Sequence, residues 1–180
     1  MSSVNPNTKP SAARDLRADV PITPTMLREI GLFGALSDDV LAHLASSLVT
    51  KRVAPGEAVF REGDAAHEMY VVLEGEMEVM KKSRRARDMR VAILGPNDCF
   101  GEMSIIDMQH RSATVRALAP SRLLRMAAED MDALYRYDLK SYTLIVLNIA
   151  RDLSRRLRVA DGLLAEFTMN VMDEYAGKAS

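Results

Sequence analysis

The chain has 180 residues, 48% of them hydrophobic, a length that allows one buried core with short appendages. Its 24 Lys and Arg residues nearly balance its 25 Asp and Glu residues, and a net charge of -1 disfavours binding of nucleic acid through the overall field. The single cysteine, Cys99, excludes an internal disulfide and a thiolate cluster for a metal, which fits a reducing cytosol.

The chain begins with a polar segment that contains four of the seven prolines within its first 24 residues. Such a composition buries too little apolar surface to order itself, and it lacks the apolar stretch of a secretory signal. We therefore expect residues 1–25 to be a flexible leader and the protein to be cytoplasmic. From Met26 onward, apolar residues recur at helical spacing and predict two short helices, the second capped by Ser37.

Between Val53 and Met126 the chain changes to short runs of Val, Ile, Leu and Met separated by glycine and proline turns. Many short strands without alternating long helices indicate antiparallel sheets. The predicted fold is mainly β with flanking α, an antiparallel double-stranded β-helix (a jelly-roll-like β-roll) over residues 26–137. The clearest predicted strands are Met69–Leu73, Met77–Met80, Val91–Leu94, Thr114–Ala117 and Leu123–Met126.

After Tyr135 apolar residues follow at intervals of three or four and predict one long amphipathic helix. The apolar face of this helix can pack on the roll or pair with the same helix of a second copy. The helix is long enough for one segment to do the first and another segment the second. We assign residues 138–167 to a lid and homodimerisation helix, with a hinge at Gly162, and 168–180 to a tail. The tail is too short for a helix-turn-helix, so direct DNA binding is not expected, and no apolar stretch approaches the roughly 20 residues of a membrane span.

The segment from Phe100 to Thr114 carries the candidate binding chemistry. Gly101 permits close approach of the backbone to a ligand or a positive φ, and the amides that follow it can face an anion. Arg111 offers a planar fork for a phosphate, a charge-assisted contact that contributes roughly 1.5 to 3 kcal/mol. Glu102 is an acceptor suited to a sugar hydroxyl.

This segment resembles the phosphate-binding cassette of cyclic nucleotide-binding domains, as found in catabolite-activator-like regulators and kinase regulatory subunits. The resemblance covers about residues 26–167, although His110 stands where many members have proline. It implies that Glu102 bonds the ribose 2'-hydroxyl and that Arg111 pairs with the equatorial phosphate oxygen. The other ligand-binding residues that it implies in the cassette are Gly101, Met103, Ser104, Ser112, Ala113 and Thr114. Further matching motifs are Leu32-Phe33-x-x-Leu36-Ser37, Pro55-Gly56-Glu57-x-Val59-Phe60-x-Glu62-Gly63-Asp64 and Met69-Tyr70-x-Val72-x-x-Gly75-x-Met77-x-Val79.

The base is contacted largely from the terminal helix in this family, and aligning on Arg155-Arg156-Leu157 places that contact near Ala160 and Asp161. Asp161 can accept from the adenine amino group, or doubly from guanine. The ligand is therefore cyclic AMP or cyclic GMP, with cyclic AMP favoured on the family's bacterial members and no metal required. We expect the protein to signal to an unidentified downstream protein whether the ligand is bound.

Other interpretations stay open from the residues alone. Glu102 and Arg111 can form an ion pair that closes a loop, and a structural adaptor that acts through homodimerisation would keep the fold without a ligand. An enzyme is disfavoured, because no nucleophile stands beside a base and the three histidines show no metal-ligand spacing. The basic run from Lys81 to Arg90 is a solvated hairpin turn or a partner-docking surface.

Overall fold

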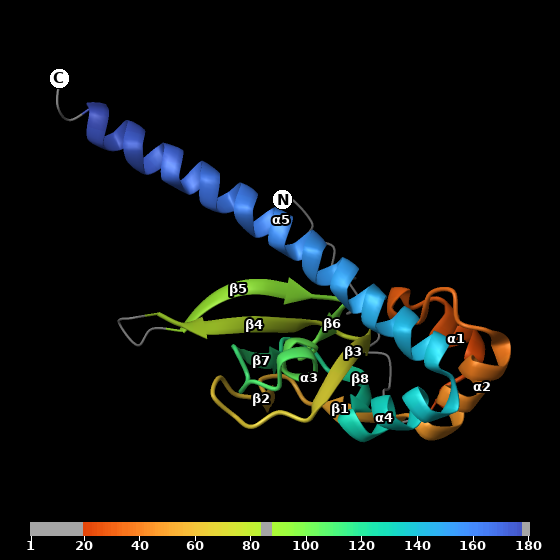
Figure 1. The fold of residues 1–180 in the computed structure, drawn as a ribbon. Coiled ribbons are helices and arrows are strands. Elements are labelled where there is room, and N and C mark those ends of the chain that lie inside the picture. Colours follow the sequence, from red (N-terminus) through yellow and green to blue (C-terminus); the bar gives the residue numbers. More distant parts are fainter. Residues whose placement is uncertain (1–19, 84–87, 178–180) are drawn as a thin grey trace, which may run out of the picture.

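The computed structural model describes residues 20–83 and 88–177, so most of the expected leader and part of the basic run, residues 84–87, lie outside the described residues. Short helices come first, then a set of strands interrupted by one helix, then two helices (Figure 1). The elements in chain order are α1 (Pro24–Arg28), η1 (Gly31–Phe33), α2 (Asp38–Ser47), β1 (Val49–Val53), β2 (Ala58–Phe60), β3 (Glu68–Glu74), β4 (Met77–Lys82), β5 (Asp88–Leu94), β6 (Cys99–Phe100), α3 (Met103–Asp107), β7 (Thr114–Ala117), β8 (Ser121–Ala127), α4 (Ala128–Tyr137) and α5 (Leu139–Gly177).

The strands form two four-stranded sheets, with the orders β1-β8-β3-β6 and β2-β7-β4-β5. Every pairing is antiparallel, which confirms the predicted mainly β roll with flanking helices. Side chains from both sheets meet in one core, which is favoured because burial removes their apolar surface from water. The fully or nearly buried members of this core are Val53, Tyr70, Val72, Met77, Leu94, Phe100, Val115, Ala117 and Leu123.

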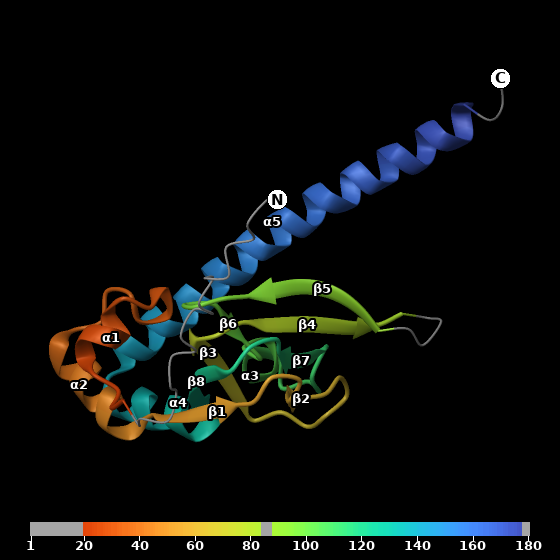
Figure 2. The same cartoon turned by 180° about the vertical axis from the view of Figure 1, so that it is seen from behind.

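The helices gather at one end of the roll, where α1, α2, α4 and the first turns of α5 lie together (Figures 1 and 2). They share a second core with β3 and β8, to which Leu41, Met69, Leu124 and Ile149 belong. Ser37 caps α2 as predicted, with its hydroxyl accepting from the Val40 amide at 3.5 Å. This second core fixes where α5 starts relative to the sheets.

The five predicted strands are all present; four start within two residues of the expected position, and β5 starts three residues earlier, at Asp88. Three short strands, β1, β2 and β6, and the helix α4 were not predicted. Short runs such as Cys99–Phe100 have too few residues to show a period, so their pairing with β3 is decided by the sheet rather than by local pattern.

The terminal helix α5 runs unbroken for 39 residues, about 58 Å at 1.5 Å per residue. Ile145 and Ile149 on its first half are buried, whereas the large apolar residues from Leu157 onward are mostly exposed. Figures 1 and 2 show the second half extending beyond the roll. The helix passes through Gly162 and through residues 168–177, where the sequence predicted a hinge and a tail, because one glycine costs only about 1 kcal/mol among strong helix formers.

None of the described helices combines the length and apolar character needed to cross a bilayer.

Candidate functional site

The cassette sits between β6 and β7 and is built by a tight turn followed by the short helix α3. Gly101 adopts φ +79°, a left-handed conformation that L side chains rarely take, and a Cβ placed there would lie 2.5 Å from Arg111 Nη1. Arg111 is held from the other side by the turn after β2. Its amide donates to Asp64 O at 2.9 Å and its carbonyl accepts from the Gly63 amide at 2.9 Å. The backbone therefore fixes Arg111 directly opposite Gly101.

The guanidinium of Arg111 is buried, with only 4% of the residue exposed. Its plane lies over the Phe60 ring, with 4.0 Å from Cζ to the ring centroid, and its Nη1 donates to Gly101 O at 3.2 Å. Its Nε has no hydrogen-bond partner within the described part of the chain. Burial lowers the pKa of Arg111, although Tyr70, Glu68, Asp64 and Glu102 act against that shift. A buried cation with an unused donor is a receptor for an anion.

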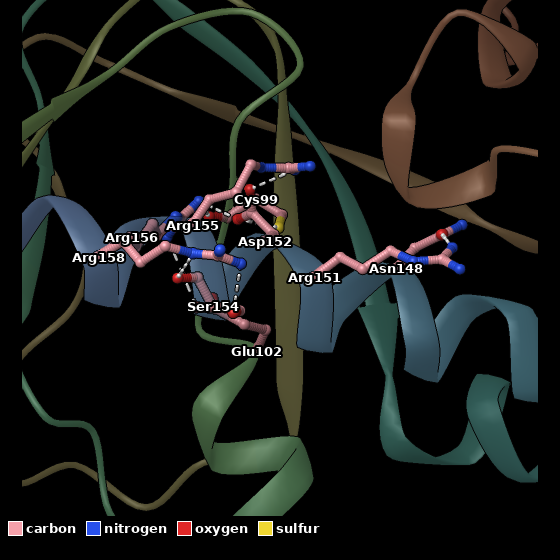
Figure 3. Close-up of polar contacts among 9 residues, drawn as sticks. All are labelled: Cys99, Glu102, Asn148, Arg151, Asp152, Ser154, Arg155, Arg156 and Arg158. Carbon is pink, nitrogen blue, oxygen red and sulfur yellow. Dashed lines mark hydrogen bonds and ion pairs between the residues drawn. The ribbon is translucent and has the colours of Figure 1, made fainter.

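Glu102 begins α3 and is equally enclosed, at 3% exposed. Its Oε1 lies 3.5 Å from Nη1 of Arg156, which reaches across from α5 (Figure 3). Burial raises the pKa of Glu102, whereas the charges of Arg156 and Arg111 lower it. The carboxylate can therefore accept a hydrogen bond inside a site from which water is largely excluded.

These two side chains line one pocket with a cavity volume of about 110 Å³. It brings together seven of the nine predicted site residues: Gly101, Glu102, Met103, Ser104, Arg111, Ser112 and Ala113.

The other two predicted residues lie outside this lining. The Thr114 hydroxyl accepts from the Glu62 amide at 3.0 Å and so closes the turn after β2, and Asp161 is exposed on α5. The sequence analysis assigned no site role to several residues that do line the pocket, although Phe60 stood in a quoted motif and Arg156 in the quoted helix run. These residues are Phe60, Val79, Leu94, Phe100, Val115 and Arg156.

An apolar groove continues from the pocket and shares Val79, Leu94 and Arg156 with it. It runs between β5 and α5, where Val159 and Ala160 form part of the helix wall. The groove offers a mostly apolar surface beside the pocket that holds Arg111 and Glu102, as a ring attached to a sugar phosphate requires. Ala160, which the sequence placed near the base, therefore lies on the groove, and its neighbour Asp161 does not.

Among the side chains that the structure describes, no group of three or more His, Cys, Asp or Glu residues is placed to hold a metal ion. Cys99 is buried as predicted, and burial raises the pKa of its thiol to about 12. The thiol therefore stays protonated, and its Sγ donates to Asp152 Oδ2 at 3.6 Å.

Comparison with known proteins gives consistent matches. The cyclic AMP receptor protein of Thermus thermophilus is 36% identical over 131 residues, which cover 72% of this chain and 58% of that protein. The solved N-terminal domain of a transcriptional regulator from Streptomyces coelicolor is 31% identical with a TM-score of 0.65, covering 74% of this chain and 93% of that one. The regulatory domain of Toxoplasma gondii PKA, crystallised with cAMP, is 26% identical with a TM-score of 0.57, covering 62% and 42%.

The chain spans between 28% and 61% of the lengths of the first curated relatives that it matches. The family model of the cyclic nucleotide-binding domain matches residues 50–138, which hold both sheets and the whole cassette. Residues 50–138 therefore belong to the cyclic nucleotide-binding domain family, with the terminal helix α5 following directly after them.

Proposed function

We propose that the protein is a regulatory sensor whose pocket binds a cyclic mononucleotide. Arg111 binds the cyclic phosphate, Glu102 accepts from the ribose 2'-hydroxyl, and the groove between β5 and α5 receives the base. Cyclic AMP is the favoured ligand, because the Thermus relative is named for it and the Toxoplasma domain was crystallised with it. Cyclic GMP remains the competing ligand.

The buried and partly unsatisfied guanidinium of Arg111 is the observation that carries this proposal. If Arg111 served only to close the loop, it would pair with Glu102. Among the hydrogen bonds and ion pairs of the described residues, none joins these two side chains, although both line the same pocket. Two opposite charges held apart across a pocket suit a ligand that bridges them.

The sensor acts on other proteins rather than as an enzyme, and α5 is the route by which it does so. Its apolar residues Leu157, Ala160, Leu164 and Phe167, which are exposed, and the half-buried Val171 recur at intervals of three and four, a spacing typical of paired helices. We propose that the protein forms a homodimer through this segment and passes the signal to a downstream cytoplasmic protein.

Thermal melting with and without cyclic AMP tests the function. Ligand at 100 times its Kd adds about 2.7 kcal/mol, and at about 2 to 4 °C per kcal/mol the midpoint rises by about 5 to 10 °C. Arg111→Ala abolishes this rise and leaves the unliganded melt nearly unchanged. The matched control, Arg158→Ala, keeps it, because among the described residues that guanidinium hydrogen-bonds Ser154 on its own helix and nothing on the roll. A structural adaptor predicts no rise for any of these chains with either cyclic nucleotide.

A further inference from the structure

Met103 places a thioether on the wall of the binding pocket, at the first position of α3. The residue is 45% exposed, and its Sδ accepts from the Ser112 hydroxyl at 3.8 Å. Ser112 lines the same pocket as Arg111 and Glu102. Met103 is therefore accessible to solvent while its sulfur contacts a polar group of the pocket.

The other methionines of the described residues do not combine these two features. Several are fully buried in the two cores, among them Met69, Met77 and Met126. The methionines that are at least as exposed as Met103 do not line the pocket: Met89, Met108, Met169 and Met172. Within the described part of the chain, Met103 is thus the methionine that is both exposed and part of the pocket wall.

Cys99, the single cysteine of the chain, is a poor target for oxidation at this site. It is buried, its Sγ contacts Asp152 (Figure 3), and burial raises the pKa of its thiol to about 12. A thiol is oxidised through its thiolate, which a pKa of that size keeps scarce at neutral pH. A thioether has no proton to lose, so its sulfur reacts directly. The accessible sulfur beside the ligand is therefore that of Met103.

We propose that Met103 is an oxidation site, at which a peroxide converts the thioether to a sulfoxide and thereby weakens ligand binding. The inference rests on the proposed function and adds a chemical modification that regulates the same pocket. In the reaction the sulfur attacks one peroxide oxygen, the O–O bond breaks as the S–O bond forms, and the other oxygen leaves as water after proton transfer. The sulfur loses two electrons and the peroxide gains them. A dithiol-dependent reductase reverses the change: the oxygen leaves as water and the dithiol becomes a disulfide.

The sulfoxide changes the pocket in two ways. A thioether sulfur is a weak hydrogen-bond acceptor and a sulfoxide oxygen is a strong one, so oxidation holds the Ser112 hydroxyl more firmly and keeps it from the ligand. The added oxygen also makes an apolar side chain polar and larger beside a cavity of about 110 Å³. Loss of one hydrogen bond to a charged phosphate corresponds to a rise in Kd of about tenfold or more.

Calorimetry on peroxide-treated and untreated protein tests this site, with mass spectrometry to identify the oxidised methionines. Three chains are compared: the unsubstituted chain, Met103→Leu, which keeps an apolar side chain of similar volume, and the control Met108→Leu. Met108 is 89% exposed on the same cassette but does not line the pocket. Hydrogen peroxide raises the Kd for cyclic AMP about tenfold in the unsubstituted chain and in Met108→Leu, and less than about twofold in Met103→Leu. A methionine sulfoxide reductase with dithiothreitol restores the affinity.

Three outcomes would overturn the inference. Equal weakening in all three chains assigns the effect to another residue. An unchanged Kd in protein whose Met103 is oxidised shows that the sulfoxide does not disturb binding. Oxidation of Met108 while Met103 stays reduced shows that the thioether is protected.

Met103→Gln supplies a second readout that needs no peroxide, because its polar side chain has a similar length. We expect untreated Met103→Gln to bind cyclic AMP more weakly than untreated Met103→Leu, and equal affinity in these two variants contradicts the mechanism. Failure of the untreated, unsubstituted chain to bind either cyclic nucleotide refutes the proposed function itself. That result differs from binding that peroxide leaves unaltered, which refutes the oxidation site alone.

Discussion

Gly101→Ala tests whether binding depends on the buried position of Arg111. Gly101 holds φ +79°, and the new Cβ would stand 2.5 Å from Arg111 Nη1 and 3.3 Å from Glu68 O. The first distance is shorter than any real contact, and Arg111 is the partner free to move. The substitution therefore strains the turn and pushes the guanidinium from its place over Phe60.

The two effects differ in size and in readout. An L side chain in the left-handed region costs about 1 to 2 kcal/mol, which lowers the melting midpoint by about 2 to 8 °C in a domain of this size. Displacement of Arg111 removes hydrogen bonds to a charged group that contribute about 1.5 to 3 kcal/mol, so the Kd for cyclic AMP rises roughly 10- to 150-fold.

Gly56→Ala is the matched control, because Gly56 has a similar φ of +81° and a Cβ there meets nothing within 4 Å. Calorimetry and thermal melting on the three chains separate backbone strain from displacement of Arg111. We expect both variants to melt earlier and only Gly101→Ala to bind more weakly. Unchanged affinity in Gly101→Ala, or equal weakening in both variants, would refute the role assigned to Arg111.

Three further outcomes follow from the same structure. Glu102→Gln weakens cyclic AMP binding about 10- to 100-fold by calorimetry while the fold persists, because it replaces one buried acceptor of the pocket; unaltered affinity would remove Glu102 from the site. Burial raises the pKa of Glu102 in the folded chain, so the folded state holds its proton more tightly than the unfolded chain, and this group's contribution to stability falls as the pH rises through the two pKa values. Thermal melts of the unsubstituted chain and of Glu102→Gln between about pH 5 and pH 8 check this sign, since the difference between them grows in favour of Glu102→Gln at higher pH. Leu164→Asp, at a position 64% exposed, leaves the melting midpoint of the roll within about 2 °C but halves the mass seen by sedimentation if α5 pairs two copies; an unchanged mass contradicts that pairing.

Local sequence patterns predicted much of the fold. Short runs rich in Val, Ile, Leu and Met, separated by glycine and proline turns, identified β3, β4, β5, β7 and β8. The cassette was also visible, since Gly101, Glu102 and Arg111 lie in one continuous segment whose spacing matches the family motif. The strands β1, β2 and β6 were missed. β2 and β6 have only three and two residues, too few to show a pattern, and β1 carries Thr50, Lys51 and Arg52 at three of its five positions.

The sequence by itself determined the main strands of the roll, the cassette and the existence of a long terminal helix, since each shows in a run of residues close together in the chain. Only the tertiary structure decided which side chains meet across elements. It brought Arg156 to Glu102, left Asp161 on the outer face of α5, and enclosed Arg111 with its Nε unpaired. The physical reason is that the second core sets the path of α5 across the roll. That path, and not the periodicity of the helix sequence, decides which face of α5 lies toward the pocket.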